Sequence, residues 1–193
     1  MEIVNMKSLN AAQLSQAAQM LTDEMPLGWA AFEDAMREVD YWVGHAGESS
    51  ETGRKLGGSG RITFLAALED GEVIGWCGIL PSYGGNVFEL HPLVVRRDWQ
   101  RKGVGTALVN AVSDAAREQG GLTIWLGADD EKPGGQTSLA NADLYDDLPG
   151  KMEAFEPGDH QAAFYLKAGF KVVGVMPDAD GRGKPDIFLA MRL

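Results

Sequence analysis

The chain has 193 residues, enough for one domain with a well-buried core and short for two. Its net charge of −11 at pH 7 argues against nucleic-acid binding, which needs a basic surface, and is compatible with a cationic small molecule. No apolar run is as long as a membrane span, and residues 1–20 lack the apolar core of a signal peptide. We therefore expect a single domain over residues 1–193, in the cytoplasm, with neither a nucleic-acid nor a membrane partner.

The N-terminal part of the chain predicts two helices and a loop. Residues 11–39 have apolar side chains three and four positions apart, with a second helix from about 30 to 39. Residues 44–60 are rich in glycine and serine, which is typical of a flexible loop or an insertion.

Three strands are expected next. Residues 61–68 and 73–80 are apolar runs joined through Asp70-Gly71, and Asp-Gly between two such runs indicates a β-hairpin. A third strand is expected over residues 86–95. The single cysteine, Cys77, excludes an internal disulfide and lies in an apolar run without a recognisable His or Asp partner, so we expect a buried thiol.

A charged loop with two glycines follows the third strand and leads into an amphipathic helix over residues 103–118. Gly103 and Gly105 allow the backbone to approach a ligand closely, and a helix N-terminus presents unpaired N–H groups to an anion. The pattern Gln-x-x-Gly-x-Gly therefore predicts a backbone cradle for a pyrophosphate. Its expected members are Arg101, Lys102, Gly103, Val104, Gly105 and Thr106.

The C-terminal part alternates strands and helices. We expect a strand over residues 122–127, a helix over 161–168, and strands over 170–176 and 187–192. The acidic segment 128–158 is expected to contain one short helix near 139–147.

The third strand carries the expected chemistry. Because side chains alternate along a strand, Glu89, His91, Leu93 and Val95 should share one face. A carboxylate or an imidazole there could remove a proton from an amine. Such a pair in isolation is more often a solvated glutamate and a hydrogen-bonded histidine, but its place directly before the glycine loop favours catalysis. Pro92 has no N–H to donate and predicts a bulge or an unpaired edge.

The glycine loop after a strand, together with the order of elements, resembles the acetyl-CoA loop and the fold of the GNAT superfamily of N-acetyltransferases. The resemblance implies an α+β fold in α/β/α layers, with a mixed central sheet whose parallel strands splay around acetyl-CoA. It further implies that backbone groups of Leu93, Val94 and Val95 bind the acetyl and pantetheine portions. Tyr165, in a Phe-Tyr-x-x-x-Gly-Phe pattern, lies where this family usually has its general acid, although the same aromatic residue in isolation fits a core position. The family often has an asparagine at the start of this helix, where this chain has Asp159 and His160.

Five further blocks resemble aminoglycoside 6′-N-acetyltransferases. They are Phe-Glu-Leu-His-Pro-Leu-Val-Val at 88–95, Leu-Gly-Ala-Asp-Asp at 126–130, Asp-Leu-Tyr at 143–145, Val-Gly-Val-Met-Pro at 173–177 and Lys-Pro-Asp-Ile at 184–187. This resemblance implies direct acetyl transfer to the 6′-amine, with Glu89 as base, His91 assisting and Tyr165 protonating the thiolate. It also implies a homodimer.

An aminoglycoside carries several ammonium groups, so its site should combine carboxylates with aromatic walls. For Asp129 and Asp130, substrate contact is favoured over capping a loop or a turn, whereas acidic residues like those of 143–156 more often form a solvated face. Acetylation of another amine, or binding of an acyl-CoA without turnover, is the alternative. With three histidines and one cysteine we expect no metal site. The side chains expected to contact substrate are Trp29, Tyr83, Glu89, Asp129, Asp130 and Asp143, with Trp76 as a further aromatic wall.

Overall fold

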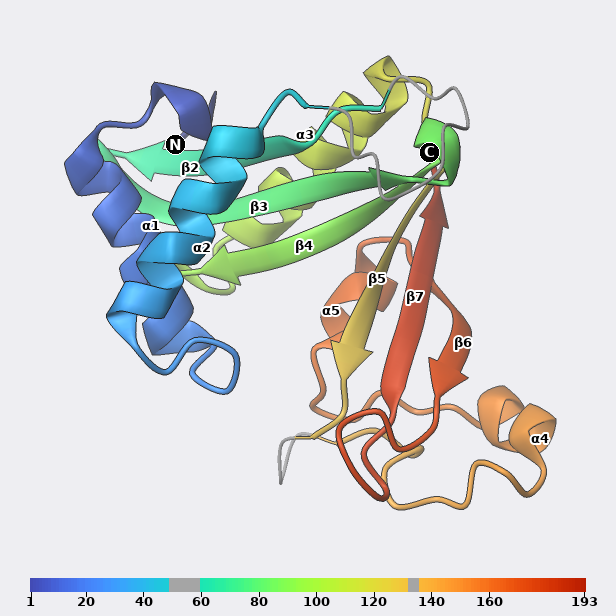
Figure 1. Ribbon diagram of the computed structural model, residues 1–193. Coiled ribbons are helices and arrows are strands. Elements are labelled where there is room, and N and C mark those ends of the chain that lie inside the picture. Colours follow the sequence, from blue (N-terminus) through green and yellow to red (C-terminus); the bar gives the residue numbers. More distant parts are fainter. Residues whose placement is uncertain (49–59, 132–135) are drawn as a thin grey trace. The chain divides into compact units, whose positions relative to one another are not determined.

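The computed structural model describes residues 1–48, 60–131 and 136–193. These residues form two compact units, one made of residues 1–124 with Leu193 and the other of residues 125–192 (Figure 1). Most of the predicted loop 44–60 lies outside the described residues. Its first two residues continue a helix instead.

The first unit contains four antiparallel strands in the order β1-β2-β3-β4. The hairpin between β2 and β3 is confirmed, with Asp70 and Gly71 both at positive φ (51° and 83°), as a tight turn between twisted strands requires. β1 is the one strand of this unit that the sequence pattern did not predict. The bounds are β1 Glu2–Asn5, β2 Thr63–Glu69, β3 Glu72–Ser82 and β4 Val87–Val95.

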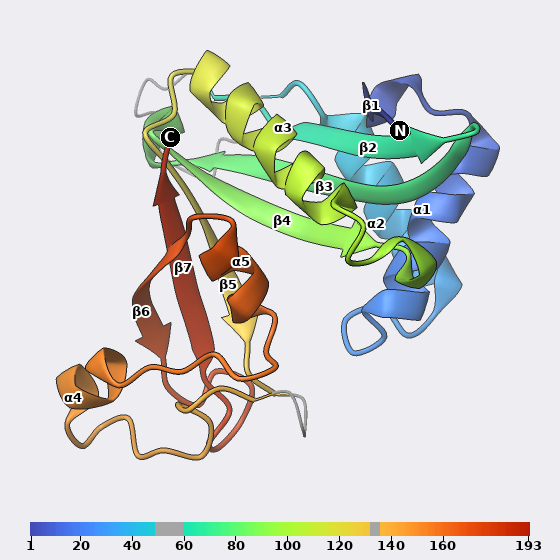
Figure 2. The same cartoon turned by 180° about the vertical axis from the view of Figure 1, so that it is seen from behind.

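Two helices cover one face of these strands and a third helix covers the other (Figures 1 and 2). α1 (Ala11–Glu24) begins with a capping box in which the side chains of Asn10 and Gln13 each accept the other's backbone N–H. α2 (Phe32–His45) begins and ends later than predicted. α3 (Val104–Glu118) lies against β2, β3 and β4 and is followed by Gly120 at φ 82°.

The core between the strands and the α1–α2 pair combines aliphatic side chains with the aromatic side chains of Phe64 and Trp76. Phe64 and Trp76 are fully buried there, and the Trp76 indole N–H donates to the Ala17 carbonyl at 3.1 Å. Trp76 therefore packs in the core, which corrects its predicted place in the wall of a substrate cleft. Cys77 is buried, as expected, and burial raises the pKa of its thiol.

β5 (Thr123–Asp129) starts beside the start of β4. The backbone N–H groups of Leu122 and Thr123 both donate to the carbonyl of Asn86, at 2.8 and 3.2 Å. The chain therefore enters β4 and β5 at neighbouring points.

The second unit has the strand order β5-β7-β6, with β6 (Lys171–Met176) antiparallel to β7 (Asp186–Arg192). α5 (Ala162–Lys167) packs on β6 and β7. The predicted helix over 139–147 is wrong. α4 (Leu148–Glu153) begins where that helix should end, because the Asp147 side chain caps it by accepting from the Gly150 N–H and Pro149 occupies its first turn.

Candidate active site

The loop after β4 has the geometry of an anion cradle. Gly103 lies at φ 87° directly before α3, and a side chain built on it would meet no atom within 4 Å. Arg101, Lys102 and Gly103 are exposed. Because no side chain caps α3, its first backbone N–H groups remain available to a ligand. A phosphate group fits this donor set.

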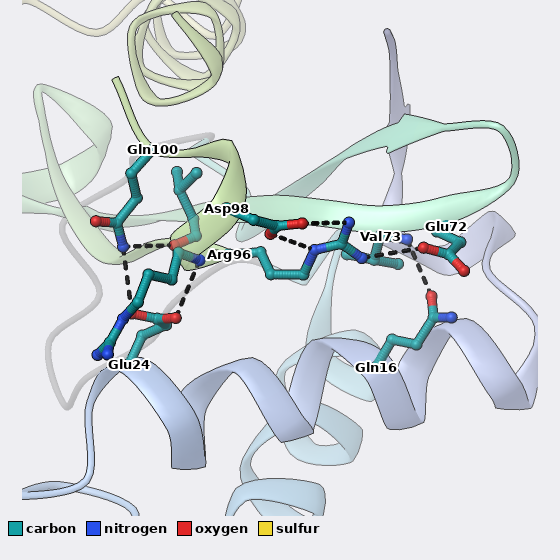
Figure 3. Close-up of polar contacts among 9 residues, drawn as sticks. Gln16, Glu24, Glu72, Val73, Arg96, Asp98 and Gln100 are labelled. Carbon is teal, nitrogen blue, oxygen red and sulfur yellow. Dashed lines mark hydrogen bonds and ion pairs between the residues drawn. The ribbon is translucent and has the colours of Figure 1, made fainter. Parts of the chain in front are cut away.

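The loop is anchored by polar contacts at its start (Figure 3). The Arg96 guanidinium donates to Asp98 at 2.8 Å and to Glu72 at 3.0 Å. Gln100, the first residue of the Gln-x-x-Gly-x-Gly pattern, donates to the Val95 carbonyl at 2.9 Å. These contacts hold the loop against the end of β4.

The bulge predicted at Pro92 is present. β3 and β4 pair Ile79 with Leu90 and Cys77 with Leu93, so two residues of β4, His91-Pro92, lie opposite a single residue of β3. The peptide bond between them is cis.

The bulge changes which side chains share a face. Glu89 pairs with Leu80, which packs on the core beneath α1 and α2. Leu93 pairs with Cys77, three positions away from Leu80, and so points to the opposite face. The expectation that Glu89, His91, Leu93 and Val95 share one face is therefore wrong beyond His91, because the extra residue of the bulge inverts the alternation.

His91 lies among aromatic side chains of the first unit. Its ring centroid is 6.3 Å from Trp29 and 6.4 Å from Trp42. Trp42, in α2, stacks on Phe64 at 5.5 Å. Trp29 was predicted to contact the substrate. Trp42 was not predicted, although its position three residues after Val39 on the same helix could have indicated it.

Tyr165 lies in the second unit, on α5, and is 7% exposed. Its ring meets Phe164 and Phe170 edge-on, at centroid distances of 5.1 and 5.6 Å. Tyr83 belongs to the short η2 turn (Tyr83–Gly85) of the first unit and is 78% exposed.

Three carboxylates of the second unit, Asp129, Asp180 and Asp186, form what we call the acidic group. Partial burial raises the pKa of Asp129 to about 6, reinforced by repulsion from Asp180, Asp186 and Glu131. Burial also raises the pKa of Asp186. Asp180 was not predicted, since it lies in a turn with no periodic pattern. Repulsion among these groups would be relieved by a bound cation.

The other two predicted acidic residues are held by local hydrogen bonds. The Asp130 carboxylate is fully buried and accepts from the backbone N–H and the hydroxyl of Thr137, the latter at 2.6 Å. The exposed Asp143 carboxylate accepts from the Tyr145 N–H at 3.1 Å. The Asp130 carboxylate is therefore bound by Thr137, which fits the capping role weighed for it above.

His160 ties the start of α5 to the end of β5. Its Nδ1 accepts from the Ala162 N–H at 3.2 Å, so its Nε2 carries the proton and donates to the Asp129 carbonyl at 3.0 Å. This histidine stands near the position where the resemblance implied an asparagine.

The predicted residues thus divide between the two units. Glu89, His91, Trp29 and the loop 101–106 belong to the first unit, where His91 and Trp29 come together. Tyr165, Asp129, Asp130 and Asp143 belong to the second.

The sequence model of the acetyltransferase (GNAT) family matches residues 18–134, more than half of the chain. The chain belongs to the GNAT acetyltransferase family. No curated protein sequence matches it. The predicted GNAT fold with a mixed sheet is confirmed by this match and by similar solved structures.

This GNAT acetyltransferase is similar to a solved aminoglycoside 6′-N-acetyltransferase in complex with coenzyme A, with 31% identity, a TM-score of 0.84, and coverage of 100% of this chain and 97% of that one. A second similar structure is the aminoglycoside 6′-N-acetyltransferase from Enterococcus faecium, with 32% identity, a TM-score of 0.82 and the same coverage. A third is an aminoglycoside 6′-acetyltransferase type Ii, with 28% identity, a TM-score of 0.70 and again the same coverage.

Acetyl-CoA is the acetyl donor of this acetyltransferase, as it is throughout the GNAT family. The open space beside Gly103 and the uncapped start of α3 fit its pyrophosphate. Within residues 1–48, 60–131 and 136–193, His, Cys, Asp and Glu side chains do not gather in threes that could ligate a metal ion. In the same ranges, no helix has the length and apolarity to cross a bilayer.

Proposed function

We propose that this acetyltransferase transfers the acetyl group of acetyl-CoA to the 6′-amine of aminoglycosides and so confers resistance to them. The observation that carries the proposal is the similarity, over the whole chain and at 31–32% identity, to two solved aminoglycoside 6′-N-acetyltransferases. The acidic group and the aromatic side chains around His91 supply the chemistry that a polycationic sugar needs.

We propose that both units together form one acetyltransferase domain over residues 1–193. Arg101 to Thr106 hold the pyrophosphate through backbone N–H groups, and Leu93, Val94 and Val95 bind the acetyl and pantetheine portions. When bound, acetyl-CoA supplies a thioester whose carbonyl carbon accepts the amine nitrogen as the C–S bond breaks.

Glu89 removes a proton from the substrate ammonium, directly or through a water, because only the neutral amine has a lone pair to donate. His91 assists by lying on the same face of β4 as Glu89. The Leu93 N–H donates to the carbonyl oxygen as negative charge develops there. Tyr165 donates its phenolic proton to the departing thiolate.

We propose that Trp29 and Tyr83 contribute aromatic surface to the substrate contacts, while Asp129 and Asp143 contribute negative charge. The carboxylate of Asp130 is bound by Thr137. We further propose a cytoplasmic location, where the free Cys77 stays reduced.

A homodimer is part of the proposal. β6 is the edge strand of the order β5-β7-β6, and Val173 and Met176 on it are 61% and 51% exposed. An exposed apolar edge strand favours pairing with a second copy. Light scattering of the purified protein, with Val173→Lys as the disrupting variant, measures the mass of the assembly.

Thiol release from acetyl-CoA tests the reaction. Kanamycin and tobramycin are compared with spermidine and a lysine peptide, and Glu89→Gln and Tyr165→Phe are assayed beside the wild type. We expect turnover with the aminoglycosides alone, reduced about 10²-fold or more in Glu89→Gln. Turnover only with spermidine or the peptide would make this an acetyltransferase of another amine. Binding of acetyl-CoA without turnover on any amine would make it an acyl-CoA-binding module.

A further inference from the structure

The last residue of α1, Glu24, binds the loop that leads into α3. One carboxylate oxygen accepts from the backbone N–H of Arg97 at 3.0 Å, and the other accepts from Nε2 of Gln100 at 3.2 Å (Figure 3). The Nε of Arg97 lies 3.7 Å from that second oxygen. Glu24 thus contacts the start and the end of the turn between β4 and the glycines.

The environment of Glu24 differs from that of the other carboxylates at this loop. Its side chain is 13% exposed, whereas those of Glu72 and Asp98, which pair with Arg96, are 58% and 64% exposed. A covered carboxylate that accepts from a backbone N–H fixes geometry more firmly than an exposed ion pair, which contributes little.

Gln100 extends the connection to β4. The same amide nitrogen that donates to Glu24 also donates to the Val95 carbonyl at 2.9 Å. Since Gln100 directly precedes Arg101, these bonds set the direction in which the chain enters the glycine loop.

We propose that Glu24 is a positioning residue for the cofactor loop, holding the segment from Arg97 to Gln100 so that the N–H groups after it point toward the pyrophosphate. The inference rests on the assignment of that loop to acetyl-CoA in the proposed function. A negative charge beside an anion site weakens anion binding by direct repulsion. The hydrogen bonds and the charge of Glu24 therefore act in opposite directions, and a measurement can separate them.

The test measures the Kd of coenzyme A by calorimetry, and the KM for acetyl-CoA and kcat by steady-state kinetics, for Glu24→Ala, Glu24→Gln and the control Asp23→Asn. All measurements are made below the lowest Tm among these proteins. Glu24→Ala is expected to raise both Kd and KM about tenfold, the effect of losing a hydrogen bond to a charged group, with kcat within about threefold of wild type. Glu24→Gln keeps an oxygen for the Arg97 N–H and should restore affinity to within about threefold of wild type. Asp23→Asn removes an exposed carboxylate charge from the residue before Glu24 and leaves the Glu24 contacts in place, so coenzyme A should bind it as tightly as wild type or more tightly.

Two results would overturn the inference. One is a Glu24→Ala protein that binds coenzyme A as well as wild type or better, since the charge alone would then matter. The other is an equal loss in Glu24→Ala and Glu24→Gln with kcat falling in proportion, which indicates general damage. Gly103→Val tests the loop assignment itself: unchanged coenzyme A affinity there would overturn the assignment. Binding of coenzyme A needs no amine substrate. The affinities measured here can therefore be interpreted even if the enzyme does not acetylate aminoglycosides.

Discussion

Asp186 lies against the bare backbone of Gly127. A methyl group on Gly127 would come within 2.6 Å of one carboxylate oxygen of Asp186 and 2.9 Å of the other. β5 and β7 are neighbours in the sheet, so the missing side chain allows the Asp186 carboxylate to lie over β5. There it adds to the rise in the pKa of Asp129 that is caused first by burial and then by Asp180. A glycine thus helps to assemble the acidic group.

Gly127→Ala is expected to displace the Asp186 carboxylate and weaken the acidic group. KM for kanamycin should rise about fivefold, the effect of losing roughly one exposed charge contact, while the Kd of coenzyme A stays unchanged. Steady-state kinetics give both values. Gly44→Ala is the matched control, because a methyl group at Gly44 meets no atom within 4 Å. An unchanged KM for kanamycin in Gly127→Ala would show that the Asp186 carboxylate does not contribute to substrate binding.

Asp129→Asn is expected to stabilise the protein at neutral pH and to do so less in acid. The pKa of Asp129 is raised to about 6 in the folded protein from an ordinary value of 3.8. The folded state therefore holds this proton more tightly than the unfolded state, and the stability it contributes is fully present below about pH 4 and lost as pH rises through 6. The Tm of Asp129→Asn should exceed that of wild type at pH 7.5, with the difference shrinking toward pH 4. A difference that is constant with pH would refute the raised pKa.

Thr137→Val should unfold more easily than wild type. It removes the hydroxyl that donates to the buried Asp130 carboxylate and accepts from the Leu139 N–H at 3.1 Å. The free energy of unfolding, measured in urea, should fall by about 1.5–3 kcal/mol, the range for a hydrogen bond to a charged group. Thr137→Ser keeps the hydroxyl, so its free energy of unfolding should fall much less. Equal stability of the valine and serine variants would contradict the role assigned to this bond.

His160→Ala should lower kcat more than it raises KM. The variant loses the acceptor for the Ala162 N–H and the donor to the Asp129 carbonyl, so α5 is no longer tied to β5. Because α5 carries Tyr165, we expect kcat to fall about fivefold, which corresponds to roughly 1 kcal/mol. The asparagine of His160→Asn can still accept a hydrogen bond from the Ala162 N–H, so the kcat of this variant should lie between those of wild type and His160→Ala. Wild-type kcat in His160→Ala would show that the position of Tyr165 does not depend on this tie.

The elements that the sequence predicts best are those with strong local signals. Asp70-Gly71 predicts the β2–β3 hairpin because only a few residue pairs tolerate two positive φ angles in succession. The helix predicted near 139–147 is absent: Leu139 and Leu144 are buried, at 1% and 5% exposure, but in turns rather than in a helix. Burial alone does not distinguish these conformations. β1 was missed because four residues are too few to show a periodic pattern.

The site shows the same limit. Pro92 indicates the bulge, since proline cannot donate to a ladder, but the inversion of faces beyond it follows only from the pairing with β3. Asp180 and Asp129 are far apart in the sequence but repel each other in the folded protein, and no local pattern near either residue predicts this interaction. Long-range electrostatic relationships of this kind need the fold.

The bulge in β4 also has a consequence for how this protein can vary. It allows one strand to direct Glu89 toward the α1–α2 layer and Leu93 toward the α3 layer, so two neighbouring stretches of backbone serve different sides of the sheet. Inserting or deleting a single residue between Glu89 and Leu93 would exchange those sides, whereas replacing a side chain there would not. The number of residues between Glu89 and Leu93 should therefore be under stronger selection than the identity of those residues. Related sequences should differ at these positions by substitution and not by insertion or deletion.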